Sequence, residues 1–334
     1  MDRVQTKTGR IAAASRRCIA LTGVNTPLGL RLVKRLAASD DRTEVVVLDR
    51  RKPLDLPAEV RFERVDLTRP TADGRLAETL ARTRADALVH LAFRTEPTRD
   101  VEADHELETI GTLHLLQAAS DARVRRLIVA SSTMLYGPRA DNPTYLTESH
   151  PLRGHRHAHC VQNRVEVERM VAQWSAQHAD AEVCVLRGCW VVGPSTRDHV
   201  SRYLTRSIVP VVMGYDPLMQ LLHEDDWLHV FESAVRDGHC GVYNIVGTGV
   251  APLSHLLRSA GRRVLALPFP VLERSTAWLG VPSPGDPPAG FYDYLRYLWV
   301  ADGARGWSAF GEPVYSTQEA WASLASAGRL RRSA

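Results

Sequence analysis

A glycine turn near the N-terminus has residue types and spacing that suit a dinucleotide phosphate. An apolar run over 18–21 leads into this turn, and a segment with helical periodicity follows it. Gly23 can form the tight turn, Gly29 lets the helix pack closely on the strand, and the helix N-terminus can face a pyrophosphate. Thr26 occupies the middle position, where its Cβ would crowd the phosphate although its hydroxyl could donate a hydrogen bond. The residues expected at the phosphates are Gly23, Asn25, Thr26, Pro27, Leu28 and Gly29.

An acidic residue follows at the distance that a nucleotide ribose requires. Asp49 ends a second apolar run, 45–48, about 20 residues after the turn. Its carboxylate can accept two hydrogen bonds from a ribose diol, whereas Arg50 or Arg51 could meet a 2′-phosphate. Because Asp49 would repel that phosphate, we expect NAD, with NADP as the alternative. The competing interpretation is a Rossmann-like domain that binds no nucleotide.

Alternating strand and helix signals indicate the elements that would position these groups. Apolar runs predict strands over 17–22, 44–49, 60–65, 86–92, 125–132 and 182–188, and helical patterns fall at 27–38, 72–83, 101–122 and 160–178. This order predicts an α/β fold: a Rossmann-like, doubly wound parallel sheet with a smaller C-terminal substrate-binding lobe. We expect a flexible tail over 1–16, a dinucleotide-binding domain over 17–190, and a lobe over 191–330. From that lobe, 242–247 would return to the main sheet.

Composition narrows the class of protein. The 334 residues are 44% hydrophobic with a formal net charge of +4, and basic residues are scattered among acids. No nucleic-acid partner is therefore expected. No run of about 18 apolar residues predicts a membrane span. The five cysteines form no CxxC pair, which favours reduced thiols and a cytoplasmic location.

Six further segments, taken in order, resemble the extended short-chain dehydrogenase/reductase family, the NAD-dependent epimerase/dehydratase group. They are 66–67 (DL), 89–94 (LVHLAF), 128–137 (IVASSTMLYG), 186–194 (LRGCWVVGP), 221–226 (LLHEDD) and 241–247 (GVYNIVG). The resemblance implies that Asp66 and Leu67 lie by the adenine and Ala92 beside the ribose or pyrophosphate. It places Ser132 at the catalytic Ser/Thr position, hydrogen-bonding the oxygen that is oxidised or reduced. It also implies a homodimer formed through the helices 101–122 and 160–178.

The chain departs from this family at its proton relay. Members use a Tyr followed four residues later by a Lys, but no lysine follows Lys52 here. Counting back from Glu168, which matches a family Glu, puts Arg164 at the Lys position and Cys160 at the Tyr position. Arg164 could hold ribose hydroxyls with its permanent charge. Cys160 could serve as an acid, because an arginine and a helix N-terminus lower a thiol pKa; a small buried thiol is the alternative.

Three alternating histidines precede the same helix. His155, His157 and His159 could place an imidazole near the substrate as acid or base. A metal site is a weaker alternative, because this spacing closes no coordination shell and shows no acidic partner. A solvated surface loop is the remaining interpretation. We therefore predict no metal.

Three other residues are assigned to the substrate. Ser131 adjoins Ser132 and could alternatively cap the end of a strand. Trp190 replaces residues that nucleotide-sugar members use, which puts a sugar nucleotide in doubt and suggests a flatter or more apolar ligand, or core packing. His223 is expected to organise the loop beneath the substrate.

These features predict an NAD(P)-dependent oxidoreductase, epimerase or dehydratase acting on a hydroxyl or keto group of a small metabolite, with a non-standard proton donor. The donor would be one of the three histidines or Cys160. Because the Tyr–Lys pair is missing, two alternatives stay open: a non-redox lyase, cyclase or isomerase with a structural dinucleotide, and a non-catalytic NAD(P)-binding regulator.

Overall fold

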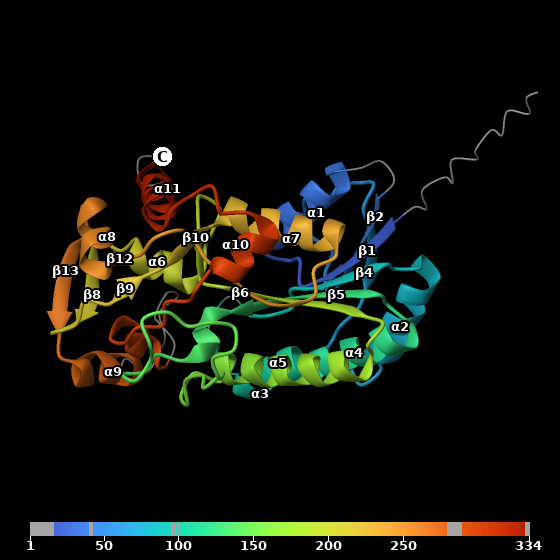
Figure 1. The fold of residues 1–334 in the computed structure, drawn as a ribbon, viewed down its shortest axis with the longest axis horizontal. Helices are drawn as coiled ribbons and strands as arrows, with labels where there is room; N and C mark the ends of the chain where they lie inside the picture. Colours follow the sequence, from blue (N-terminus) through green and yellow to red (C-terminus); the bar gives the residue numbers. More distant parts are fainter. Residues whose placement is uncertain are drawn as a thin grey trace, which may run out of the picture.

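A seven-stranded parallel sheet forms the centre of the molecule (Figure 1). The computed structural model describes residues 17–39, 43–94, 96, 98, 100–278 and 289–330. The strand order is β11-β6-β5-β4-β1-β2-β3. The bounds are β1 Arg17–Thr22, β2 Thr43–Asp49, β3 Arg61–Arg64, β4 Ala87–His90, β5 Arg126–Ser132, β6 Glu182–Gly188 and β11 Gly241–Ile245. The predicted Rossmann-like α/β class is confirmed, and the tail 1–16 lies outside the described residues.

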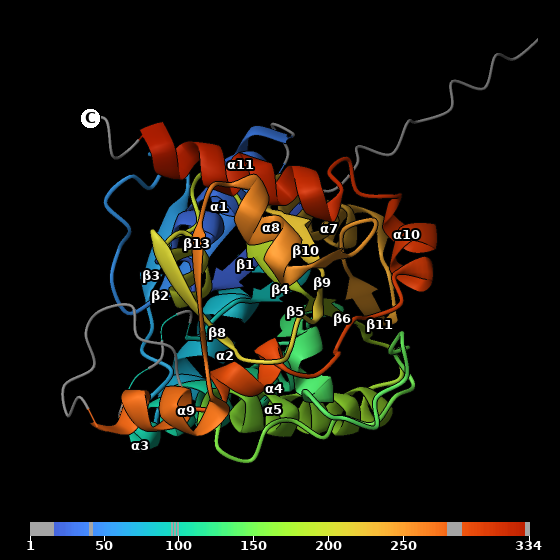
Figure 2. The same cartoon turned by 90° about the vertical axis from the view of Figure 1, so that its left-hand side faces the viewer.

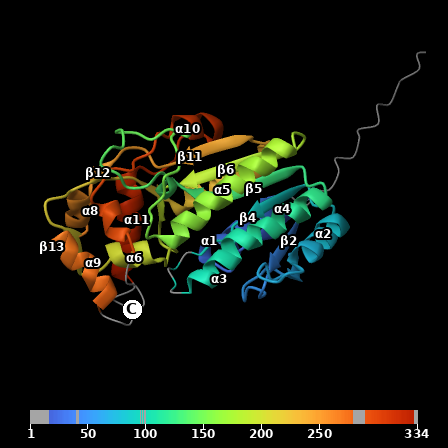
Figure 3. The ribbon, with the colours of Figure 1, turned by 90° about the horizontal axis from the view of Figure 1, so that it is seen from below.

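Helices cover both faces of this sheet. Figure 1 shows α1 and α7 above the strands and α2, α4 and α5 below them, and Figure 3 shows the lower layer from beneath. The bounds are α1 Pro27–Ser39, α7 Glu224–Asp237, α2 Ala72–Thr83, α4 Gly111–Asp121 and α5 His159–Gln177. Strand β1 shows why both layers are needed, since Ile19 and Leu21 join the core on one face and Cys18 and Ala20 the core on the other. Successive side chains of a strand point to opposite faces of the sheet, and helices cover both faces here, so the strand is apolar along its whole length.

The predicted helix 101–122 is interrupted. Helix α3 (Val101–His105) runs into a π-helical turn, η1 (Glu106–Ile110), before α4 begins. The wider turn includes Glu108, whose side chain is fully buried. Single π-turns inside helices are frequent at functional sites. The sequence pattern could not distinguish this turn from an ordinary helix because its apolar spacing is nearly the same.

The C-terminal part builds a smaller lobe beyond the carboxyl ends of the strands (Figure 2). Its strands pair as β8 with β13, β9 with β12, and β7 with β10. The strand bounds are β7 Trp190–Val192, β8 Ile208–Val212, β9 Leu218–Met219, β10 Leu221–His223, β12 Ala251–Pro252 and β13 Arg263–Leu267. The helix bounds are α6 His199–Leu204, α8 Leu253–Ser259, α9 Phe269–Trp278, η3 Phe291–Leu295, α10 Ala304–Phe310 and α11 Thr317–Leu330. Across the described ranges, every helix is too short or too polar to cross a bilayer.

We predict that Gly23→Ala destabilises the protein by more than about 2 kcal/mol. Gly23 has φ +72°, and a Cβ there would lie 2.3 Å from the backbone nitrogen of Ala92. The substitution therefore combines left-handed strain with a backbone clash between the ends of β1 and β4. Urea denaturation measures the loss. Gly74→Ala is the control, because Gly74 lies in helix α2 and a Cβ there would meet nothing within 4 Å, so stability should be unchanged or slightly higher.

Candidate functional site

The glycine turn is ordered by its own threonine. Thr26 precedes α1 and its Oγ accepts a hydrogen bond from Gly29 N at 3.0 Å, while its carbonyl accepts from Leu30 N at 3.0 Å. Pro27 occupies the first helical position, which needs no N–H donor. Thr26 is thus an N-cap. Its oxygen accepts within the helix while its O–H proton is still able to donate, so the hydrogen bond to a phosphate stays a prediction.

Asp49 ties the second strand to the turn. Its carboxylate accepts from Val24 N at 3.1 Å and from Arg50 N at 2.7 Å. The neighbouring Asn25 side chain donates to the Arg51 carbonyl at 2.7 Å. These bonds leave lone pairs on both carboxylate oxygens at the carboxyl end of β2, where a ribose would lie.

The other residues assigned to the nucleotide lie at neighbouring strand ends. Asp66 accepts from the backbone and hydroxyl of Thr68 at 3.2 and 2.8 Å, so part of its capacity stabilises its own turn. Leu67 is buried. Ala92 packs against Gly23 where β4 ends. None of these three residues lines the cavity described next, so their contacts with a nucleotide stay predictions.

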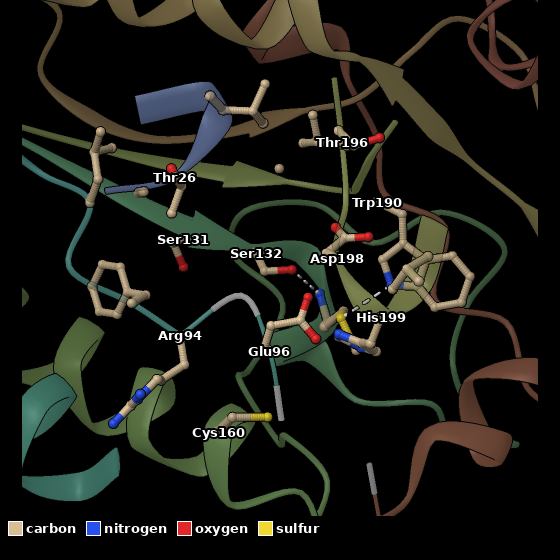
Figure 4. Close-up of a pocket in the computed structure, with 18 of the residues that line it drawn as sticks. Thr26, Arg94, Glu96, Ser131, Ser132, Cys160, Trp190, Thr196, Asp198 and His199 are labelled. Carbon is tan, nitrogen blue, oxygen red and sulfur yellow. Dashed lines mark hydrogen bonds between the residues drawn. The ribbon is translucent and has the colours of Figure 1, made fainter. Parts of the chain in front are cut away.

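One cavity of about 380 Å³ joins the turn to the C-terminal lobe (Figure 4). All of the turn residues 25–29 line one end of it. Ser131 and Ser132, Cys160, Arg164 and Trp190 line the rest. The fold thus brings residues from β5, α5 and β7 into the same cavity as the turn.

The two serines have different partners. Ser132 Oγ accepts from Met134 N at 3.2 Å and so begins the short helix η2 (Thr133–Tyr136), but its side chain still faces the cavity. Ser131 donates to Glu168, whose carboxylate forms a buried ion pair with Arg187, 2.6 Å between Oε2 and Nη2. The hydroxyl of Ser131 therefore belongs to a buried polar network as well as to the cavity wall.

Cys160 and Arg164 lie one helical turn apart on α5 and both line the cavity. Burial raises the pKa of the Cys160 thiol although Arg164 opposes the shift, so the expected lowering of this pKa is wrong. Arg164 donates to the Arg94 carbonyl at 2.6 Å and lies 3.8 Å from Glu108. Burial also raises the pKa of Glu108. Because the pKa of Cys160 is raised above its usual range, its thiol keeps its proton at neutral pH.

The three histidines do not line this cavity. His155 Nε2 lies 2.9 Å from Asp293 Oδ2, an acidic partner that the sequence did not reveal. His157 and His159 are exposed. The acid/base role of these residues stays a prediction, and the solvated-loop interpretation suits His157 and His159 but not His155, whose side chain is only 12% exposed. Within the described segments, no group of three or more His, Cys, Asp or Glu side chains could hold a metal ion.

Trp190 and His223 have contrasting positions. The Trp190 ring lines the cavity and stacks on Phe291, with centroids 5.6 Å apart and planes 8° from parallel. It serves packing and the cavity wall together. His223 is buried away from the cavity, where it accepts from Asp225 N at 3.2 Å and stacks on Tyr315 at 3.9 Å. It caps α7 and orders its own loop, in keeping with the loop-organising role that the sequence suggested, and any direct contact with the substrate stays a prediction.

Several lining residues were not predicted from the sequence. Glu96, Asp198 and His199 face the cavity from short segments without periodicity (Figure 4). Tyr294 comes from η3, and its hydroxyl donates to the Met134 carbonyl at 2.9 Å. Burial raises the pKa of Tyr294 well above its usual range. This tyrosine is thus a weak acid whose proton is already bonded.

The sheet is doubly wound, and its glycine turn lies where the strand order reverses, between β1 and β4. Together with the cavity shared with the second lobe, this arrangement defines a nucleotide-binding protein of the Rossmann class. The NAD dependent epimerase/dehydratase family matches residues 19–245, and the chain belongs to that family.

The chain is also similar to several individual proteins. An uncharacterized protein of Mycobacterium tuberculosis is 30% identical over 260 residues, which cover 76% of this chain and 67% of that protein. A 3-diazoavenalumate denitrifying reductase of Streptomyces is 28% identical over 183 residues, 51% of this chain and 57% of that one. Among solved structures, a dTDP-glucose 4,6-dehydratase from Streptomyces venezuelae with NAD bound has a TM-score of 0.72 at 22% identity, covering 95% and 98% of the two chains.

Proposed function

We propose that this protein binds NAD and reduces or oxidises a hydroxyl or keto group of a small metabolite, using Cys160 in place of the usual tyrosine. The observation that carries this proposal is the single cavity that Asn25–Gly29, Ser132 and Cys160 line together. The C-terminal lobe, 191–330, would supply most of the substrate contacts. The homodimer and the cytoplasmic location stay predictions.

The residues present fit the dinucleotide. Helix α1 begins at Pro27 and directs its positive end toward the phosphate end of the cavity. Asp49 would accept hydrogen bonds from the adenine ribose hydroxyls and disfavour a 2′-phosphate. Arg164, held in place by the Arg94 carbonyl, lies where it could meet the second ribose. When bound, NAD exchanges a hydride at its nicotinamide ring.

The chain's own residues must move the proton. Ser132 would hydrogen-bond the reacting oxygen, as its position at the end of β5 allows. In the reductive direction, the substrate oxygen becomes an alkoxide as hydride arrives, and the Cys160 thiol gives it a proton. The thiolate then regains a proton from solvent. An alkoxide is far more basic than a thiolate, so a thiol of raised pKa can still deliver its proton.

The reductive direction has support outside this chain, since one relative is named as a reductase. The protein as purified should carry NAD or bind it on titration, detected by native mass spectrometry and calorimetry. NADH with small ketones and aldehydes should then lose its reduced-nicotinamide absorbance. Product without that change would instead establish the non-redox alternative, and nucleotide binding without product the regulator. Uptake of neither NAD nor NADP would overturn the proposal.

Asp49→Ala should weaken NAD binding about 10- to 100-fold, because hydrogen bonds to a charged acceptor contribute about 1.5–3 kcal/mol. NADP binding should weaken much less, since the carboxylate no longer repels its extra phosphate. Calorimetry with both nucleotides checks the expectation. Asp55→Ala is the matched control, because Asp55 is an exposed acid in the loop after β2. Equal losses for NAD and NADP would contradict the ribose role of Asp49.

A further inference from the structure

The arginines that line the cavity are already bonded within the protein. Arg94 Nε lies 2.9 Å from Asp104 Oδ1, and its guanidinium points away from the centre of the cavity in Figure 4. Arg164 donates to a carbonyl at 2.6 Å. Arg197 donates to the carbonyls of Pro194 and Thr196, each at 2.9 Å. Each bond occupies only part of a guanidinium, and Arg164 Nε is without a hydrogen-bond partner among the described residues. A diphosphate would still share the remaining donors with the protein's own acceptors.

Two carboxylates face the same space. Glu96 and Asp198 project into the cavity beside Ser132 (Figure 4). Arg202 holds Glu96 through a bond of 2.8 Å and a second, shorter one. Asp198 Oδ1 accepts from Ser201 N at 2.8 Å and thereby caps α6. Burial raises the pKa of Asp198, and the charge of Glu96 adds to the shift while His199 opposes it. Because Arg202 already pairs with Glu96, Asp198 is the carboxylate of the two that is more available to a ligand's donor group.

Trp190 and Phe291 form an apolar part of the cavity wall, where their rings stack. Tyr203 does not line the cavity but packs edge-on against Phe291, with centroids 4.9 Å apart. The indole N–H of Trp190 is directed at Met134 Sδ, 3.3 Å away, so the ring orientation is fixed. Such a wall suits the face or edge of a planar ring.

We propose that the substrate is a planar aromatic molecule whose cationic or hydrogen-bond-donating group lies against Asp198, and that it carries no nucleotide diphosphate. The ring would lie along the wall of Trp190 and Phe291. Asp198 would be the residue that determines specificity. One of its carboxylate oxygens caps α6, and the remaining acceptor sites of the carboxylate are available to a ligand beside that wall. This assignment rests on the proposed function, because it assumes that NAD occupies the end of the cavity lined by residues 25–29.

The test uses the NAD-loaded protein and four probes in calorimetry: tryptamine, tryptophol, indole-3-acetate and UDP-glucose. These indoles share one ring and differ in the charge of the side chain. Tryptamine should bind about 10- to 100-fold more tightly than indole-3-acetate. The ammonium of tryptamine can donate a charge-assisted hydrogen bond to Asp198, whereas the carboxylate of indole-3-acetate cannot. Tryptophol should fall between them. Tighter binding of UDP-glucose than of tryptamine would overturn the inference.

Asp198→Asn should abolish the preference for tryptamine over tryptophol. Asparagine still caps a helix, so α6 should persist. Asp141→Asn is the control, because Asp141 is an exposed acid bonded to Arg153 outside the cavity. A preference that survives Asp198→Asn would overturn the role of this residue.

The pH dependence separates ionisation of Asp198 from that of its neighbours. Tryptamine needs the ionised carboxylate, and the pKa of Asp198 is raised, so affinity should increase as pH rises through that pKa. Glu96, His199 and Arg202 also face this carboxyl, and they remain in Asp198→Asn. The variant should therefore lose the rise, and an unchanged profile would contradict the inference. Failure of the proposed function can be distinguished from failure of this inference. NAD binding is titrated separately, and the relative affinities of the three indoles can also be measured on the protein without nucleotide.

Discussion

Glu168→Ala should lower the free energy of unfolding by about 3–5 kcal/mol. Glu168 on α5 and Arg187 on β6 each have side chains only 6% exposed, and the guanidinium makes contacts of 2.6, 3.0 and 3.1 Å with the carboxylate. Removing the acid leaves a buried arginine charge without its partner. It also removes the acceptor of the Ser131 hydroxyl at the cavity wall. Urea denaturation followed by circular dichroism measures the loss.

Two variants control this experiment. Glu166→Ala removes an exposed acid from the same helix and should change stability by no more than about 0.5 kcal/mol. Replacing Glu168 and Arg187 together by methionine removes both charges and should recover most of the loss. A Glu168→Ala protein within about 1 kcal/mol of the original would mean that water reaches Arg187 and that the pair is not truly buried.

Cys160→Ala should lower the rate of ketone reduction by about 10²- to 10⁴-fold, the usual contribution of a positioned acid. The thiol lines the same cavity as Ser132, and its raised pKa keeps it protonated through neutral pH. The rate of the unaltered protein should therefore be flat near neutrality and fall only above the usual thiol range, where the donor loses its proton. Stopped-flow loss of NADH absorbance measures the hydride step.

The matched control is Cys240→Ala, which removes an exposed thiol and should leave the rate unchanged. Replacing His155, His157 and His159 together should also leave the hydride step intact, because none of them lines the cavity. Full activity of Cys160→Ala would exclude the thiol as the proton donor. A strong loss in the histidine variant would instead restore the imidazole to the mechanism.

The nucleotide half of the fold was predictable because its signals are local. Strands β1, β2 and β5 are covered on both faces, so each appears in the sequence as a continuous apolar run. The observed bounds of these strands lie close to the predicted ones. The turn at Gly23 needs a positive φ and a close approach to Ala92, both of which require glycine. The π-turn at 106–110 was missed because it changes the helical spacing by too little to alter the pattern.

The substrate half was not predictable in the same way. Asp198 and Phe291 lie in short segments whose neighbours in the sequence say nothing about the cavity. The histidines at 155, 157 and 159 have chemistry that suits a proton relay, but their spacing fixes only their common side of an extended strand, not what that side faces. Cys160 was placed by register, and its burial reversed the expected direction of its pKa shift.

The sequence by itself determined the dinucleotide turn, the acid at the end of β2 and the lack of any lysine after Lys52, because each depends on residue identity at short range. The tertiary structure alone decided which side chains share the cavity, since β5, α5 and η3 lie far apart along the chain and meet only where the parallel strands end. It also decided their proton affinities. Desolvation depends on everything packed around a group, and no stretch of sequence contains that surrounding.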